Sequence, residues 1–150
     1  MNLLLDTQVF LWWDRRDKAL NVDTRAVIAD PAHQIFVSAA SIWEIAIKRQ
    51  LKKLDYRGSA VPAANGFLEL PMLPIDAENA GGLAWRHNDP FDRMLVAQAR
   101  CLTFALASAD VTVRAYPNVG GVTRVRGQCR DHAATACDHV SKWLAPKFAG

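Results

Sequence analysis

Apolar and polar residues follow two different patterns over residues 1–120, and these patterns predict strands separated by helices. Residues 3–5 are three consecutive leucines, which is typical of a short strand buried on both faces of a parallel sheet. A β-rich run at 34–38 and an apolar run at 102–107 predict two more strands, and 67–75, which holds two prolines, predicts a strand or an extended link. The predicted helices lie at 7–13, from Asn21 or Asp23 to about residue 29, at 39–51, at 77–85 with Asp76 as N-cap, and at 91–101.

The alternation of strand and helix indicates the α/β class, with a three-layer α/β/α domain around a mainly parallel central sheet. Two adjacent glycines at 120–121 mark a change in character. We therefore expect a main domain over residues 1–119 and a basic C-terminal extension over 120–150, partly helical or disordered. Within that extension, 122–125 predicts an edge strand, and apolar residues between 133 and 144 fall near helical spacing.

Length and composition fit a single compact domain with a tail. The chain has 150 residues, of which 51% are hydrophobic, enough to form a real core. No apolar run approaches the ~20 residues that a membrane span needs, and no basic segment precedes the first leucines as it would in a signal peptide. The three cysteines do not form a disulfide framework. We therefore expect a cytoplasmic protein that does not interact with membranes.

The charge is unevenly distributed along the chain. Residues 1–120 hold 13 basic and 13 acidic residues, so the net charge of +3 lies entirely in the last part of the sequence. A local basic run nevertheless stands inside the main domain, formed by Lys48, Arg49, Lys52 and Lys53. It is either the solvated face of a helix or a surface that contacts the phosphate backbone of RNA.

Four acidic residues occupy positions that a parallel sheet brings together. Asp6 and Asp110 follow two predicted strands, whose carboxyl ends open on the same edge, and Glu44 and Asp92 lie on helices beside them. Four carboxylates in one partly desolvated site repel one another unless a cation neutralises them. An all-oxygen set suits Mg²⁺ or Mn²⁺. Such a site favours metal-assisted hydrolysis of a phosphodiester.

Each of these acids also has a simpler structural interpretation. Asp6 is a suitable N-cap for the helix that follows it. Glu44 is four residues before Lys48, in the order that favours an ion pair on a helix. Asp89 competes with Asp92 for the metal role, but its place before a proline explains it as an N-cap, so we favour Asp92.

The chain resembles a PIN-domain ribonuclease, and more narrowly a VapC-type toxin of a type II toxin–antitoxin system. Four segments carry the resemblance in unbroken order: 3–7 (LLLDT), 38–45 (SAASIWEI), 89–95 (DPFDRML) and 108–110 (SAD). The resemblance covers residues 1 to about 119. It implies a metal-dependent endoribonuclease that cleaves structured RNA (tRNA or rRNA), forms a homodimer and is paired with a VapB-type antitoxin.

By the same resemblance, the main metal-site acids are Asp6, Glu44 and Asp92, and Asp110 completes the ring. Thr7 and Ser108 would hydrogen-bond a carboxylate or a water, with helix capping as the alternative. Arg93 would steady a carboxylate or contact phosphate, with a structural ion pair as the alternative. We interpret His87 as a surface turn residue rather than a base. The His and Cys residues of the extension do not follow a recognised zinc spacing.

Three other functions remain open at this level. A haloacid-dehalogenase-like phosphatase also begins with a strand ending in Asp, but its mechanism needs a second Asp two residues later, where this chain has Gln8. A DNA- or flap-specific nuclease of the same fold generally carries extra elements that this chain lacks. The main alternative is a catalytically inactive PIN-type module that binds RNA or protein.

Overall fold

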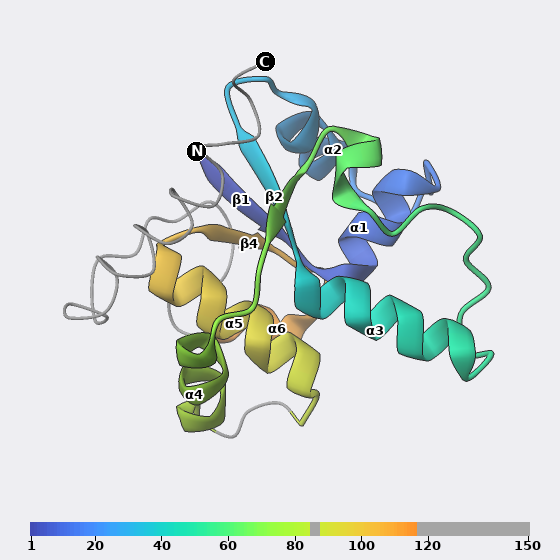
Figure 1. The fold of residues 1–150 in the computed structure, drawn as a ribbon. Helices are drawn as coiled ribbons and strands as arrows, with labels where there is room; N and C mark the ends of the chain where they lie inside the picture. Colours follow the sequence, from blue (N-terminus) through green and yellow to red (C-terminus); the bar gives the residue numbers. More distant parts are fainter. Residues whose placement is uncertain (85–87, 117–150) are drawn as a thin grey trace, which may run out of the picture.

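The computed structural model describes residues 1–84 and 88–116, which form a four-stranded, all-parallel sheet flanked by helices (Figure 1). The strand order is β3-β2-β1-β4. The strands are β1 (Asn2–Leu5), β2 (Gln34–Ser38), β3 (Leu68–Leu70) and β4 (Ala105–Ala107). The helices are α1 (Thr7–Asp14), α2 (Val22–Ala29), α3 (Ala39–Gln50), the 3₁₀ helix η1 (Pro62–Asn65), α4 (Pro74–Gly82), α5 (Pro90–Leu102) and α6 (Val111–Arg114).

The register of the sheet places the ends of three strands at the same level. Leu5, the last residue of β1, pairs with Val37 of β2 and with Ala107 of β4. The backbone N–H of Asp6 continues this ladder and donates to the carbonyl of Ala107 at 3.0 Å. The residues that follow β1 and β4 therefore lie side by side, although about a hundred positions separate them in the sequence.

Each face of the sheet is covered by its own group of helices. Leu4 of β1 packs in a cluster with side chains of α4, α5 and α6. Its neighbours Leu3 and Leu5 point the other way and pack with side chains of α1, α2 and α3. Burial on both faces explains the unbroken leucine run of β1. The predicted three-layer α/β/α fold is confirmed, and Figure 1 shows the two sets of helices on opposite sides of the sheet.

Two predicted element boundaries are wrong. The helix α4 begins at Pro74, so Asp76 is not its N-cap but lies in its first turn and accepts the N–H of Leu73 at 2.9 Å. Proline suits the first helical position, and an acidic residue at the third position can bond back to the N-cap backbone. The strand predicted at 102–107 is shorter, because Leu102 packs against the core as the last residue of α5 and Thr103 ends that helix with φ 55°.

The predicted start of the second helix is confirmed, whereas predictions about the C-terminal part of the chain stay predictions. Asn21 is the N-cap of α2, and its side chain accepts the N–H of Asp23. His87 and the C-terminal extension lie outside the described residues, so their interpretations and the boundary at 119 remain predictions. Within the described residues, every helix is too short or too polar to span a lipid bilayer.

Candidate functional site

Asp6 is both a helix cap and a buried acid. It is the N-cap of α1, where its Oδ1 accepts the N–H of Gln8 at 3.2 Å, and its Oδ2 accepts the hydroxyl of Ser108 at 2.5 Å. Burial raises the pKa of Asp6, the two hydrogen bonds oppose this shift, and the negative charges of Glu44 and Asp110 add to it. The two interpretations of Asp6 are therefore compatible.

Glu44 is buried rather than placed on the open surface of α3. Its Oε2 accepts the hydroxyl of Thr7 at 2.5 Å, and its Oε1 contacts the ammonium of Lys48. The predicted ion pair with Lys48 is confirmed, but only the lysine is exposed to solvent: the side chain of Glu44 is 6% exposed and that of Lys48 46%. Thr7 therefore connects α1 to α3 through a carboxylate, in the position expected for a supporting residue.

Asp110 and Ser108 follow β4 beside Asp6. The hydroxyl of Ser108 donates to Asp6 and accepts the N–H of Asp110 at 3.0 Å. Asp110 is the N-cap of α6, and its Oδ1 accepts the N–H of Thr112 at 2.7 Å. The charge of Asp110 helps to raise the pKa of Asp6, so the two carboxylates lie close enough for their charges to interact.

Asp92 lies in the first turn of α5, behind the N-cap Asp89. Burial alone would lower the pKa of Lys48, but its hydrogen bond to Glu44 and the charges of Glu44, Asp89 and Asp92 outweigh burial, and the net shift is upward. Lys48 thus marks the position where the start of α5 approaches α3. The prediction that Asp89 is an N-cap is confirmed, since its side chain accepts the N–H of Phe91 at 2.8 Å.

The structure brings the predicted acids to one edge of the sheet without closing a complete metal cage. The charges of Glu44 and Asp110 act on Asp6, and hydroxyl groups of neighbouring residues bond Asp6 and Glu44. The charge of Asp92 acts on Lys48, the ion-pair partner of Glu44. Among residues 1–84 and 88–116, no three Asp, Glu, His or Cys side chains form a group that could hold a metal ion. The assignment of these acids as ligands therefore stays a prediction.

Arg93 is turned into the protein core. Its guanidinium donates to backbone carbonyls at the end of α4, including Ala80 at 2.8 Å and Leu83 at 2.8 Å. Carbonyls at a helix C-terminus have no partner within the helix, so a buried arginine can satisfy them. This contact fixes α4 against α5. The predicted role of Arg93 beside a carboxylate or a phosphate is not tested by it.

The basic run extends past the end of α3 and is exposed to solvent. Arg49, Lys52 and Lys53 are exposed, and Lys48 is the member of the run that contacts a candidate site acid. Three side chains of the run are therefore solvated, and Lys48 belongs to the edge where the acids meet. Contact of this run with the phosphate backbone of RNA stays a prediction.

A buried polar network behind the site was not predicted from the sequence. Gln98 of α5 is 0% exposed; its Oε1 accepts the hydroxyl of Ser38 at 2.7 Å, and its Nε2 donates to the carbonyl of Pro71 at 2.9 Å and to Asp76 at 3.2 Å. Ser38 is the N-cap of α3. Gln98 therefore connects the helix that carries Asp92 to the start of the helix that carries Glu44. The available signal was a glutamine on the sheet-facing side of α5.

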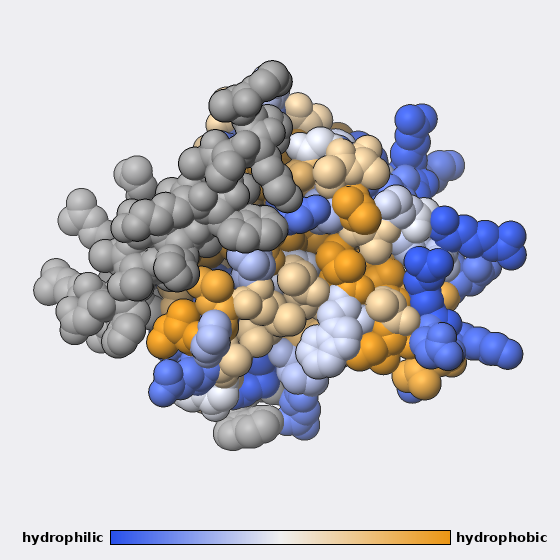
Figure 2. Space-filling view, in the orientation of Figure 1, coloured by the Kyte–Doolittle hydropathy of each residue, from blue (hydrophilic) through white to orange (hydrophobic). Residues whose placement is uncertain are grey.

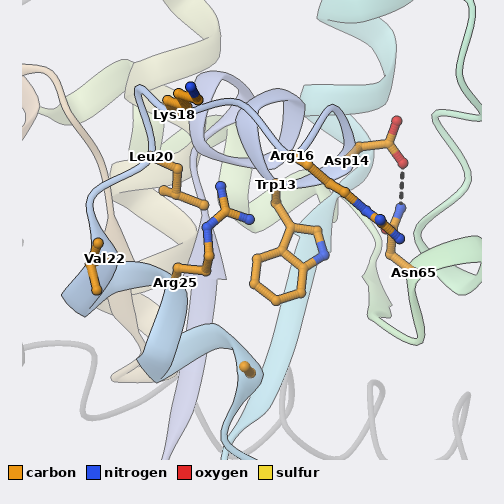
Figure 3. Close-up of a pocket in the computed structure, with 9 residues that line it drawn as sticks. Trp13, Asp14, Arg16, Lys18, Leu20, Val22, Arg25 and Asn65 are labelled. Carbon is orange, nitrogen blue, oxygen red and sulfur yellow. Dashed lines mark hydrogen bonds between the residues drawn. The ribbon is translucent and has the colours of Figure 1, made fainter.

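A separate hollow of the protein includes none of the four acids. It measures about 750 Å³ and lies between α1, α2 and Asn65 (Figure 3). The guanidinium of Arg25 lies over the ring of Trp13, and Asp14 accepts a hydrogen bond from Asn65. Its lining is mainly basic and apolar, so this hollow is not the candidate catalytic site. Its residues are Trp13, Asp14, Arg16, Lys18, Leu20, Val22, Arg25, Ala29 and Asn65.

Two comparisons with known proteins agree with the α/β/α fold. The PIN domain family model matches residues 3–118. Among solved structures, the chain is similar in fold to one in the crystal structure of VapBC2 from Rickettsia felis bound to a DNA fragment from their promoter, with a TM-score of 0.57 and 14% sequence identity, covering 80% of this chain and 96% of that one. No curated protein matches the chain. Because the family model spans well over half of the sequence, the protein belongs to the PIN domain family.

Proposed function

We propose that the protein is a metal-dependent endoribonuclease and the toxin of a type II toxin–antitoxin pair. The observation that carries this proposal is the meeting of Asp6, Glu44 and Asp110 at the carboxyl edge of the sheet, with Thr7 and Ser108 holding two of these carboxylates. Membership of the PIN family and the likeness in fold to a VapBC chain support the same function.

The chemistry of the donors fits Mg²⁺ or Mn²⁺. The candidate ligands Asp6, Glu44, Asp92 and Asp110 offer only carboxylate oxygens, which these ions prefer. The hydroxyl of Ser41, one turn before Glu44 on α3, is buried without a hydrogen-bond partner among the described residues, so the helix that carries Glu44 has a polar atom available for a further group. When bound, the ion would lower the pKa of a water and stabilise negative charge on the phosphate and on the oxygen that leaves it.

The protein supplies a preorganised, negatively charged edge. Thr7 and Ser108 fix the orientation of Glu44 and Asp6 through hydrogen bonds of 2.5 Å, so two of the candidate ligands are held in place before a cation arrives. In the reaction, a water oxygen forms a bond to phosphorus, the bond from phosphorus to one ribose oxygen breaks, and that oxygen takes up a proton. Burial is the main cause of the raised pKa of Asp6, and the negative charges of Glu44 and Asp110 add to it, so a bound cation would favour the ionised carboxylate.

RNA is the proposed substrate, because exposed cations continue from the acidic edge along α3. Arg49, Lys52 and Lys53 follow Lys48 in the sequence and are exposed, so they are available to an RNA backbone that approaches this end of α3. Contacts of this kind position RNA without reading its sequence. A loop or another irregular element of tRNA or rRNA would supply the unpaired bases that proteins recognise.

We propose that the protein forms a homodimer through the outer side of α3. Trp43 is 56% exposed and Leu51 is 57% exposed, and the residues between them on this side, Ala46, Ile47 and Gln50, carry no charge. Trp43 also packs edge-on against Phe91 of α5, with ring centroids 5.2 Å apart. Figure 2 shows apolar side chains over α3 and its neighbours, and exposed patches of this kind often mark interfaces between proteins.

We also propose that the protein pairs with a VapB-type antitoxin and acts in the cytoplasm. The similar fold comes from a structure of VapBC2 on promoter DNA, which supports a VapB-type partner for this chain. A toxin of this kind would act in the cytoplasm, where its RNA substrates are found. Co-purification with the product of a neighbouring reading frame is the direct test of the partner, and failure of the two proteins to associate would count against the pairing.

Cleavage of total RNA tests the enzymatic proposal. We expect the purified protein to cleave RNA with Mg²⁺ or Mn²⁺, chelator to stop cleavage, and Asp6→Asn to abolish it. Asp55→Asn is the matched control, because Asp55 is exposed and lies outside the site. Undiminished cleavage by the Asp6→Asn protein would exclude the proposed site. RNA binding without cleavage in either metal would instead favour the inactive binding module.

A further inference from the structure

Lys48 is placed differently from an ordinary surface lysine. Its ammonium contacts Oε1 of Glu44, whose side chain is 6% exposed, while its own side chain is 46% exposed. The aliphatic part of Lys48 thus extends from solvent toward a buried carboxylate. An ion pair between two exposed side chains one turn apart on a helix contributes little to stability and needs no buried partner.

The hydrogen bonds at the acidic edge show what Lys48 supplies. Oε2 of Glu44 accepts the hydroxyl of Thr7, and both oxygens of Asp6 accept uncharged donors, Ser108 and the N–H of Gln8. The partner of Oε1 of Glu44 is instead a full positive charge. Lys48 therefore occupies one carboxylate oxygen of a candidate metal ligand.

Lys48 also faces acids from a second helix. Besides Glu44 on its own helix, the negative charges of Asp89 and Asp92 at the start of α5 act on its ammonium. This places the positive charge between α3 and α5, at the side where the basic run begins. A lysine has a flexible four-carbon chain and a compact charge, so it can change partner without moving the backbone.

We propose that Lys48 is an exchangeable cation of the site: it neutralises Glu44 in the free protein, competes there with the divalent ion, and transfers to the scissile phosphate when RNA binds. This inference rests on the proposed function and adds a residue that acts on the reacting group. A divalent ion at Glu44 repels the ammonium, and the incoming phosphate attracts it. No covalent bond to Lys48 forms or breaks, because the exchange involves only hydrogen bonds and charge.

Binding of Mn²⁺ alone tests the competition, by calorimetry or electron paramagnetic resonance on the full chain. Lys48→Met keeps the length of the side chain and removes the charge, and we expect it to bind Mn²⁺ about tenfold more tightly, since a nearby positive charge has been removed. Lys48→Arg keeps the charge and should bind Mn²⁺ like the wild type. Lys18→Met is the matched control, an exposed lysine beside the hollow of Figure 3, and should leave Mn²⁺ affinity unchanged.

Cleavage at saturating Mn²⁺ and RNA tests the transfer to phosphate. We expect Lys48→Met to lower kcat at least about tenfold although it binds the metal more tightly, because a contact made to the reacting phosphate is lost. Lys48→Arg should recover much of kcat, and Lys18→Met should match the wild type.

The possible failures are distinguishable. Unchanged Mn²⁺ affinity in Lys48→Met, with an active wild-type protein, would overturn this inference and leave the proposed function in place. Weaker Mn²⁺ binding together with a lower melting temperature would overturn it in favour of a purely structural pair. A wild-type protein that binds Mn²⁺ but cleaves no RNA would overturn the proposed function, and the transfer to phosphate with it.

Discussion

Gln98 should contribute strongly to stability, because its buried side-chain amide bonds three polar groups, two of them through buried hydrogen bonds. In Gln98→Leu, a side chain of similar size loses the hydrogen bonds to Ser38, the carbonyl of Pro71 and Asp76. A buried polar group left without a partner costs about 1–3 kcal/mol. Asp76 keeps the N–H of Leu73, and the leucine gains some apolar burial, so we expect a net loss of about 3 kcal/mol in the free energy of unfolding.

Urea unfolding followed by tryptophan fluorescence would measure this loss. A decrease of about 3 kcal/mol is a large part of the roughly 5–15 kcal/mol that stabilises a typical domain, and it should lower the melting temperature by about 10 °C. The exposed Gln8 provides a matched control, and Gln8→Leu should change stability by no more than about 0.5 kcal/mol.

A double-mutant cycle would show whether Gln98 and Ser38, the N-cap of α3, contribute to stability as a coupled pair. Ser38→Ala removes the hydroxyl that donates to Gln98, so the double variant should be more stable than the sum of the single losses predicts, by about 0.5 kcal/mol or more. The reasoning would be refuted if Gln98→Leu cost less than about 1 kcal/mol, or if the two substitutions were strictly additive.

Three further substitutions test the site and its support. Asp6→Asn keeps the helix cap and removes a carboxylate whose pKa is raised by burial. Because that carboxylate loses its proton more reluctantly in the folded state, the variant without metal should be more stable than the wild type at neutral pH, and this gain should disappear as the pH falls below about 4. A gain independent of pH in thermal unfolding would contradict this. Thr7→Val removes the hydrogen bond to the buried Glu44 and should cost about 2 kcal/mol in urea unfolding, while Thr7→Ser should cost clearly less; equal losses would mean that the hydroxyl is unimportant. Arg93→Met leaves the carbonyls at the end of α4 without their donor and should cost about 3 kcal/mol by thermal unfolding, and a change within 0.5 kcal/mol would argue against this role.

The positions of the acids could be predicted because they depend on local pattern and on a general property of parallel sheets. The leucine run of β1 identifies a buried strand, and whatever follows a parallel strand lies at the carboxyl edge. This was sufficient to place Asp6 and Asp110 near each other. N-caps such as Asp89 and Asn21 were equally local, and both predictions were correct.

What could not be predicted depends on contacts between distant segments. Glu44 has the spacing of a surface ion pair, and only the packing of α3 against α1 explains why its carboxylate is buried. The partners of Gln98 come from β2, from the turn after β3 and from α4, so no short stretch of sequence shows them. Asp76 was misplaced because an acid can stabilise a helix start in two ways: as the N-cap, by accepting N–H groups of the first turn, or at the third position, by accepting the N–H of the N-cap residue, as Asp76 does.

The hydrogen bond from Ser108 to Asp6 has a consequence for how the protein is made. Its partners are 102 positions apart, and β4 must pair with the open edge of β1 before they can meet. A ribosome therefore has to release nearly the whole domain before the acidic edge is complete, and shorter nascent chains lack it. If the protein is a toxin, its activity therefore cannot appear during synthesis until β4 has joined the sheet.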